Sequence, residues 1–287
     1  MSMFGPLVST QWLADRLGDQ GVKIVDGSCQ MPGAQPARLD YEKRHIDGAV
    51  FFDLDDIADQ DIDLPRMLPT PEQFERQVSA LGISDQDTII VYDNQGCFSA
   101  ARVWWSFRAM GHDKVAVLNG GLPLWQKENR PVSNKPVTIT RISYKSSFNP
   151  EFVCSAKTLK THLHQRDAVI LDARSDQRFH GAAPEPRAGL RSGHMPGAAN
   201  LPYQVLLNDD QTFITSDKVA ALLASAGITP EKEVITTCGS GVTAAILSLA
   251  LELTGHSNHK LYDGSWTDWG DSRHDAREFP VVARTAK

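Results

Sequence analysis

A cysteine lies between a strand-like and a helix-like segment in the second half of the chain. Glu233 to Thr237 are mostly β-branched, which favours a β-strand. From Val242 onward, apolar residues fall at positions 242, 245, 246, 249, 250 and 253, the spacing of one helix face. The turn between them reads Cys-Gly-Ser-Gly, and its first residue is Cys238. The pattern therefore places a thiol just before the N-terminus of a helix.

This arrangement suits a nucleophilic thiol. Glycines allow backbone conformations that turn successive N–H groups inward, and a helix N-terminus adds unpaired donors with partial positive charge. A sulfur in that position would be stabilised as the thiolate by the backbone of Gly239, Gly241, Val242 and Thr243. The alternative is a buried structural cysteine that closes the strand.

Cysteine phosphatases also place a thiolate at a helix N-terminus, and they need an arginine six positions after the cysteine. Here that position is Ala244, and no basic residue lies between Cys238 and the end of the predicted helix. A phosphate would find backbone amides but no guanidinium, which argues against phosphatase activity.

The elements that position this turn belong to a long-range repeat. A short apolar run ending at Asp26 matches one ending at Asp172. HIDGA begins at His45 and HMPGA begins at His194. Further along each half, VAVLNGGLPLW matches NHKLYDGSWTDW. The shifts are 146, 149 and 144 residues, so nearly constant that they indicate duplication of a whole domain.

Within each half, strand-like runs alternate with helical patterns. This alternation is typical of an α/β fold in which helices flank a parallel sheet. The segment 126–152 contains three prolines and little periodicity, and we interpret it as a linker. The predicted organisation is therefore an N-terminal domain over 1–125, a linker over 126–152 and a C-terminal domain over 153–287.

The CGSGVTA loop, the two H-x-x-G-A segments, the DGSWTDW close and the tandem halves resemble the two-domain rhodanese-type sulfurtransferases over nearly the whole chain. The neutral Gly239 and Ser240 resemble the 3-mercaptopyruvate branch, since the thiosulfate branch typically has basic residues there. The resemblance implies two tandem rhodanese-like domains, of which the N-terminal one is catalytically inactive because Asp93 stands in the place of Cys238.

The resemblance also implies a reaction. Sulfur would pass from 3-mercaptopyruvate to Cys238 as a persulfide and then to a thiol or cyanide acceptor, releasing pyruvate. No metal or organic cofactor is expected. Thiosulfate as the donor is the nearest alternative, and a non-enzymatic rhodanese-like binding module is another. The intact glycine loop around the cysteine argues against the binding module.

Four arginines lie close together before the cysteine loop: Arg174, Arg178, Arg187 and Arg191. They form either a site for a small anion or a solvated loop whose arginines pair with neighbouring acids. The resemblance implies that Arg178 and Arg187 bind the substrate and that the other two are structural.

A cysteine nucleophile often has a histidine base, yet no histidine is close to this cysteine in the sequence. His45 and His194 occupy equivalent places in the two halves, which favours a structural role for both. The resemblance implies a Ser–His–Asp arrangement in which Ser240 is the serine and His45 the candidate histidine. Asp40 is the nearest acid.

Composition narrows the setting of this chemistry. With 287 residues, 41% hydrophobic and 22% charged, the chain suits two soluble globular domains. The net charge of −6 argues against nucleic acid or anionic membranes as partners, and no apolar run is long enough to span a bilayer. The N-terminus has no secretory pattern, and the four separated cysteines indicate reduced thiols in the cytoplasm. We therefore expect a small-molecule sulfur donor and a thiol acceptor such as a thioredoxin-like protein.

Overall fold

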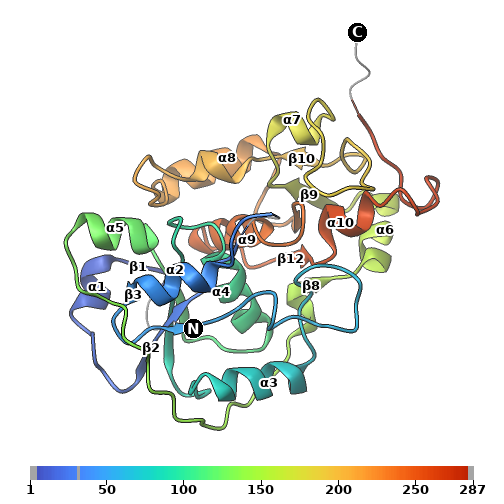
Figure 1. Cartoon of the computed structure of the whole chain (residues 1–287). Helices are drawn as coiled ribbons and strands as arrows, with labels where there is room; N and C mark the ends of the chain where they lie inside the picture. Colours follow the sequence, from blue (N-terminus) through green and yellow to red (C-terminus); the bar gives the residue numbers. More distant parts are fainter. Residues whose placement is uncertain (1–4, 31–32, 284–287) are drawn as a thin grey trace. The chain divides into compact units, whose positions relative to one another are not determined.

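The chain divides into two units, each with its own sheet (Figure 1). The computed structural model describes residues 5–30 and 33–283. Among these, unit 1 comprises the residues up to 61, 68–149 and 207–213, and unit 2 comprises 62–67, 150–206 and the residues from 214 onward. Each unit thus contains a short segment from the other half of the sequence.

Unit 1 alternates strands and helices, as predicted for the N-terminal half. Its strands are β1 (Leu7–Val8), β2 (Val22–Asp26), β3 (His45–Ile46), β4 (Val50–Phe51), β5 (Thr88–Tyr92), β6 (Val115–Leu118) and β7 (Val132–Ser133). Its helices are α1 (Thr10–Ala14), α2 (Ala37–Lys43), α3 (Pro71–Ala80), α4 (Ala100–Ala109) and α5 (Gly121–Lys127). The main sheet is parallel with the order β1-β6-β5-β2-β4, while β3 and β7 form a separate antiparallel pair.

Both faces of this sheet are covered. On one face, Leu13 of α1 and Trp125 of α5 pack in one cluster with Ile24 and Ile90 of the central strands. On the other face, α4 contacts β5 and β6. Each large apolar side chain buried in this way stabilises the fold by about 1.5–3 kcal/mol. Burial on both faces explains the apolar runs at residues 89–91 of β5 and 115–118 of β6.

Unit 2 repeats this architecture. Its strands are β8 (Val153–Cys154), β9 (Ala168–Asp172), β10 (Ala199–Asn200), β11 (Glu233–Thr237) and β12 (His259–Tyr262). Its helices are η1 (Pro150–Phe152), α6 (Ala156–Gln165), α7 (Asp176–Phe179), η2 (Tyr203–Leu206), α8 (Ser216–Ser225), α9 (Ala244–Leu253) and α10 (Ser265–Trp269). The sheet is parallel with the order β8-β12-β11-β9-β10, the same as unit 1 once equivalent strands are matched. The predicted α/β fold in two tandem copies is confirmed.

The helix that follows the cysteine loop is central to unit 2. Residues 244–251 of α9 are all buried, and the helix contacts β11, β12, α8 and η2. This burial explains why its sequence is apolar almost all round. The position of α9 against two central strands fixes the loop from 238 to 243 at the carboxyl edge of the sheet.

Most of the segment interpreted as a linker packs against unit 1. Residues 126–149 belong to unit 1: α5 continues to Lys127 and β7 pairs with β3. Tyr144 is 1% exposed, and its ring contacts those of Phe74 and Phe107. The segment lacks periodicity because it runs irregularly over unit 1, held by contacts with residues distant in sequence.

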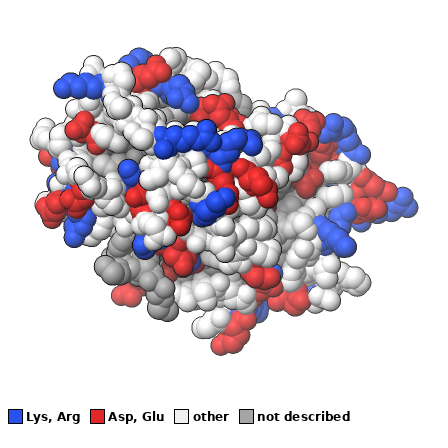
Figure 2. Space-filling model, turned by 90° about the horizontal axis from the view of Figure 1, so that it is seen from below, with Lys and Arg blue, Asp and Glu red and all other residues white. Residues whose placement is uncertain are grey.

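Charged side chains are mixed on the surface. On the face shown in Figure 2, Lys and Arg lie among Asp and Glu, in keeping with the modest net charge of −6. None of the helices in the described part of the chain combines the length and the apolar character that a membrane span requires.

Candidate active site

Cys238 directly follows β11 and is held by backbone contacts. Cys238 is 2% exposed, and its backbone N–H donates to the Ser265 hydroxyl at 3.2 Å. Its carbonyl accepts from the Trp266 N–H at 2.9 Å. The carbonyl of Gly239 accepts from the N–H and the hydroxyl of Thr267 at 2.9 and 2.6 Å. The cysteine loop is therefore attached to the start of α10.

The backbone N–H donors of this loop point to a ligand-binding role. Among the described residues, the N–H groups of 239–243 donate to no acceptor. Thr243, the N-cap of α9, makes no side-chain capping bond. A helix N-terminus normally satisfies its first N–H groups with a cap, water or a ligand. This loop therefore presents several free donors and the positive end of a helix to an anion.

The equivalent loop in unit 1 holds an anion of its own. Asp93 follows β5 as the cysteine follows β11, and its carbonyl accepts from the Leu122 N–H at 3.0 Å, matching the bond to Trp266. Asp93 Oδ1 accepts from the Gln95 N–H at 2.8 Å. Oδ2 accepts from the N–H groups of residues 98, 99 and 100 at 2.7, 2.8 and 2.8 Å. This turn is thus shaped to surround a negative charge with amides.

Arg178 brings a guanidinium to the cysteine loop. A Cβ atom added to Gly239 would lie 3.0 Å from Arg178 Nη2, so the glycine allows this close approach. Glu185, whose side chain is 1% exposed, accepts from Arg178 Nη2 at 2.5 Å and Nε at 3.4 Å. Nη1 donates to no acceptor in the described part of the chain. The guanidinium is held by one carboxylate and retains donors for a ligand.

Arg174 and Arg191 have structural contacts, as expected. Arg174 has a side chain 0% exposed that binds Asp172 at 2.7 Å and Glu185 at 2.8 Å, and its guanidinium lies 4.1 Å from the Trp266 ring centroid. Burial tends to lower its pKa, but these carboxylates outweigh burial and raise it. Arg191 donates to the carbonyls of residues 269, 270 and 279. Both arginines hold loops in place.

The other predicted residues of unit 2 lie on the same loops. Ser240 is half-buried, and its hydroxyl forms no hydrogen bond within the described residues. Arg187 is half-buried in the segment after Glu185. The sequence-predicted cysteine, serine and arginines therefore all belong to unit 2.

His45 belongs to unit 1, where it occupies the same setting as His194 in unit 2. His45 is 1% exposed, its Nδ1 lies 2.8 Å from the Tyr41 carbonyl, and its ring stacks on Tyr41. His194 Nδ1 likewise lies 2.8 Å from the Phe179 carbonyl, and its ring stacks on Phe179. These matched contacts fit a structural role in both halves. Asp40 is on α2 and pairs with its own helix neighbour Lys43 at 3.6 Å.

Ser265 is a site residue that sequence reasoning missed. Its φ is 49°, in the left-handed region that a residue with a side chain rarely adopts. The equivalent residue of unit 1 is Gly121, with φ 52°. The repeat contains the signal: GGLPLW in the first half aligns with GSWTDW in the second, so a serine occupies a glycine conformation. The serine hydroxyl accepts the Cys238 N–H and donates to the Tyr262 carbonyl at 2.9 Å.

The chain matches the rhodanese-like domain family over residues 9–128 and again over 155–272. The chain belongs to the rhodanese-like family. The two matches fall on the two halves of the repeat, in agreement with the shared strand order.

Named relatives extend over nearly the whole chain. It is 39% identical to thiosulfate/3-mercaptopyruvate sulfurtransferase 2 of Arabidopsis thaliana over 98% of this chain and 87% of the relative. It is 39% identical to the 3-mercaptopyruvate sulfurtransferase of Escherichia coli, over 96% and 98%. It is 36% identical to that of Homo sapiens, over 92% and 91%. The rhodanese-like protein is therefore an enzyme of the sulfurtransferase class.

Solved structures agree. The E. coli 3-mercaptopyruvate enzyme SseA superposes with a TM-score of 0.84 at 37% identity, covering 92% of this chain and 99% of that one. The Tum1 protein of Saccharomyces cerevisiae gives 0.87 at 30% identity and covers the whole of both chains. The two tandem rhodanese-like domains implied by the sequence resemblance are confirmed.

Proposed function

We propose that this sulfurtransferase takes sulfur from 3-mercaptopyruvate through a persulfide on Cys238. The observation that carries the proposal is the loop that follows Cys238. The N–H groups of residues 239–243 find no acceptor among the described residues, whereas the matched loop of unit 1 surrounds the Asp93 carboxylate. The same donors would stabilise the Cys238 thiolate and then the negative outer sulfur of a persulfide.

The reaction divides into two transfers. The Cys238 thiolate attacks the donor sulfur, the carbon–sulfur bond breaks, and its electron pair leaves on carbon as the enolate of pyruvate. The proton of the donor thiol passes to that enolate, leaving a persulfide anion on the enzyme. An acceptor thiolate or cyanide then attacks the outer sulfur and restores the Cys238 thiolate.

Arginine side chains would hold the donor. A 2-oxo carboxylate offers a carboxylate and a keto oxygen, and a guanidinium binds such a group through two parallel hydrogen bonds. Arg178 lies against Gly239 and keeps Nη1 available, so we assign it to the donor carboxylate. Arg187, on the neighbouring loop, is assigned the same ligand. Phosphatase activity remains disfavoured because Ala244 begins α9 where an arginine would be needed.

We assign the proton relay to Ser240, whose hydroxyl is free to take part and lies two residues after the nucleophile. The sequence also nominated His45, with Asp40 as its acid. The stacking of His45 on Tyr41 and its 1% exposure support the structural role instead. A His45→Gln variant that keeps its fold and its kcat would agree with this assignment, whereas a loss of kcat alone would return His45 to the relay.

The acceptor is proposed to be a thiol, and a thioredoxin-like dithiol would resolve the persulfide by exchange. All four cysteines of the chain are free thiols in the structure, which suits a reducing cytoplasm. A coupled assay with thioredoxin, glutathione and cyanide as competing acceptors measures which one turns the enzyme over fastest.

Steady-state rates with 3-mercaptopyruvate and thiosulfate test the donor. We expect the larger kcat/KM with 3-mercaptopyruvate, and a preference for thiosulfate would reverse the assignment. Cys238→Ser should abolish turnover with either donor while its circular dichroism stays unchanged. Arg187→Ala should mainly raise KM, and unchanged KM and kcat would remove its role.

Intact-mass spectrometry tests the persulfide and separates the enzyme from a binding module. After exposure to donor without acceptor, the protein should gain about 32 Da, lost again on addition of a thiol. Cys238→Ser should show no gain. An unmodified mass in the native protein would favour a module that binds without catalysis.

A further inference from the structure

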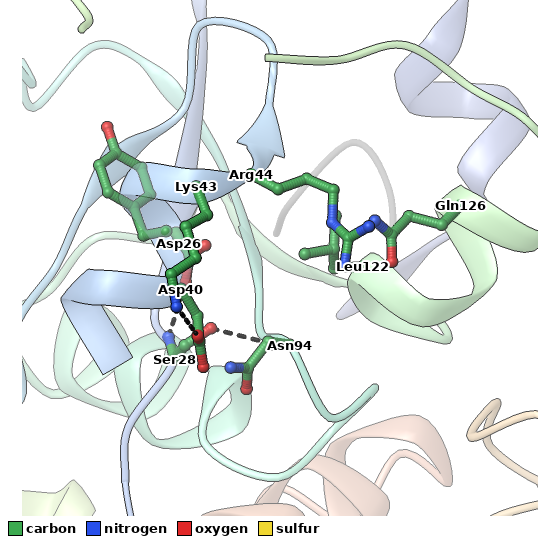
Figure 3. A pocket seen from close by; sticks show the side chains of 9 residues that line it. Asp26, Ser28, Asp40, Lys43, Arg44, Asn94, Leu122 and Gln126 are labelled. Carbon is green, nitrogen blue, oxygen red and sulfur yellow. Dashed lines mark hydrogen bonds and ion pairs between the residues drawn. The ribbon is translucent and has the colours of Figure 1, made fainter. Parts of the chain in front are cut away.

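Unit 1 has a polar cavity of about 450 Å³ at the carboxyl end of its sheet (Figure 3). It is lined by Asp26, Ser28, Asp40, Tyr41, Lys43, Arg44, Asn94, Leu122 and Gln126. The size falls within the range of small-molecule sites in proteins. The sulfur chemistry of unit 2 uses none of these residues.

The repeat shows what fills this place in unit 2. Asp26 and Asp172 each end the matching strand, and each accepts the backbone N–H two residues later at 2.9 Å. That later residue is Ser28 in unit 1 and Arg174 in unit 2. In unit 2 the arginine side chain folds back onto its aspartate. In unit 1 the Ser28 side chain also bonds to its aspartate, but it is uncharged and much smaller than a guanidinium.

The remaining walls also correspond. The Arg174 guanidinium lies on the ring of Trp266 and donates to the carbonyl of Gly193 at 2.8 Å. The repeat places Leu122 at the position of Trp266 and Arg44 at the position of Gly193, and both line the cavity. The cavity of unit 1 therefore occupies the place that unit 2 fills with its own guanidinium.

Asp26 is a buried carboxyl to which no cationic side chain among the described residues is bound. It is 1% exposed, and its hydrogen bonds come from Ser28 and Tyr92. Burial raises its pKa to about 6, as expected for a carboxylate that is not neutralised. A cationic ligand group would supply the charge that Arg174 supplies to Asp172.

The cavity also presents positive charge. Lys43 and Arg44 follow one another at the end of α2, and Figure 3 shows the Arg44 guanidinium facing the Gln126 amide. With its oxygen turned toward the guanidinium, Gln126 accepts from Arg44 Nε at 2.5 Å and Nη1 at 3.3 Å. Among the described residues, Lys43 is paired with Asp40 at 3.6 Å, which leaves Asp26 and Arg44 as the lining charges without an oppositely charged partner. A ligand with one charge of each sign would match them.

We propose that this cavity binds a small zwitterion of the amino-acid class, with its guanidinium or ammonium group on Asp26 and its carboxylate on Arg44. The cationic end takes the place held by Arg174 in unit 2. The site is independent of the sulfur transfer proposed for Cys238, since all its lining residues belong to unit 1.

Isothermal titration calorimetry with L-arginine as the probe tests the site. We expect saturable binding with one site per chain, and weaker binding of methylguanidinium and of acetate, each of which carries half of the recognised chemistry. Cys238→Ser should bind L-arginine as the native chain does, so this result does not depend on the catalytic proposal. If no binding is detected up to about 10 mM L-arginine, the proposal is overturned. A dissociation constant of that size corresponds to a binding free energy of about −3 kcal/mol.

Two variants assign the binding to Asp26. Asp26→Asn should weaken L-arginine binding at least about tenfold, because it removes a charge-assisted hydrogen bond. Ser28→Arg should abolish binding by placing in the cavity the side chain that unit 2 has there. Asp47→Asn changes an exposed aspartate outside the cavity and serves as the matched control.

Equal affinities in the native chain, Asp26→Asn and Asp47→Asn would place L-arginine elsewhere and refute the site. Arg44→Gln separates the two ends of the ligand: it should weaken L-arginine but leave methylguanidinium unchanged. If circular dichroism shows that Ser28→Arg does not fold, Asp26→Asn against Asp47→Asn decides the question alone.

Discussion

The two strand-to-helix loops of this protein share one backbone design and differ at one decisive residue. In unit 1, the carboxylate of Asp93 accepts four N–H groups of its own loop. In unit 2, Cys238 takes that position and the N–H groups of 239–243 find no acceptor within the described residues. The ring of inward-facing N–H groups is therefore a property of the fold. The side chain at its centre is a carboxylate that the loop itself binds in unit 1 and a thiol in unit 2.

A second difference concerns the aspartates that precede these loops. Asp172 is neutralised by a fully buried Arg174, whereas Asp26 has Ser28 at the matching position. In unit 2, the buried aspartate is thus paired with an arginine of the same unit. Unit 1 leaves a buried carboxyl beside a cavity.

Cys238→Asp is the most severe test of the loop comparison. The variant places the Asp93 side chain of unit 1 at the matching position of unit 2. Its carboxylate should therefore accept hydrogen bonds from the loop N–H groups and cap α9. We expect sulfurtransferase activity to fall at least about 10³-fold, since the proposed nucleophile is removed. We expect the free energy of unfolding to rise by about 0.5–2 kcal/mol, the usual value of an N-terminal cap. Steady-state kinetics and urea unfolding measure the two effects.

The control for this exchange is Cys154→Ser. Cys154 is buried, and burial raises the pKa of its thiol to about 12, so it should have no part in the reaction. Full activity in that variant would show that loss of a buried thiol does not by itself inactivate the enzyme. A Cys238→Asp protein clearly less stable than the native chain would mean that the two loops are not equivalent cradles.

The paired variants Asp172→Asn and Asp26→Asn test the second difference. The first removes the main anion of a guanidinium whose side chain is 0% exposed, and breaking such a buried pair costs about 3–5 kcal/mol. The second removes a charge that burial already disfavours, so at pH 8 it should be neutral or stabilising. Urea unfolding of both proteins at pH 8 measures the contrast. Equal losses of stability would contradict it.

Asp26 also predicts a pH dependence of stability. Its pKa is raised by burial from 3.8 to about 6 in the folded chain, so the folded state binds this proton more tightly. The resulting stabilisation is complete below about pH 4 and is lost as the pH rises through 6, a change of up to about 3 kcal/mol. Urea unfolding of the native chain and of Asp26→Asn at pH 4.5 and pH 8 measures this component. It is the difference between the two proteins in the free energy of unfolding at each pH. A difference that stays constant with pH would show that Asp26 is not the group responsible.

Strong local patterns allowed the loop of the proposed nucleophile to be placed from sequence. The β-branched run of β11 and the helical spacing after Val242 gave the strand, turn and helix in their observed order. The repeat then identified Asp93 as the counterpart of Cys238. These signals are local or periodic, so they do not depend on knowing how distant segments pack.

Features that depend on distant contacts escaped prediction. Residues 126–149 have no periodicity, yet Tyr144 is buried in unit 1 by rings from α3 and α4. The close approach of Arg178 to Gly239 joins helix α7 to a loop 61 residues later in the sequence and depends on how α7 packs at the end of β11. The difference between Ser28 and Arg174 was visible in the repeat, but the cavity that results required the side chains in place.

Ser265 offers the smallest and most specific test of the comparison. It adopts φ 49° where unit 1 has Gly121 at φ 52°, and its hydroxyl accepts the Cys238 N–H at 3.2 Å. Ser265→Ala removes the hydroxyl and keeps the strained backbone, whereas Ser265→Gly removes the hydroxyl and relieves the strain. Urea unfolding should therefore find the glycine variant about 1 kcal/mol more stable than the alanine variant.

The kinetics of these two variants separate strain from loop positioning. Both lose the acceptor of the Cys238 N–H, so both should show a similar decrease in kcat/KM, about three- to tenfold for one hydrogen bond. Equal stabilities would mean that the serine carries no backbone strain. A decrease in the alanine variant alone would mean that backbone conformation, rather than the hydroxyl, places the cysteine. We predict unequal stability with equal activity. That result would mean that Ser265 adopts a glycine-like backbone conformation because its hydroxyl is needed to bind the Cys238 N–H. Gly121 of unit 1 has no hydroxyl and makes no such contact with the Asp93 loop.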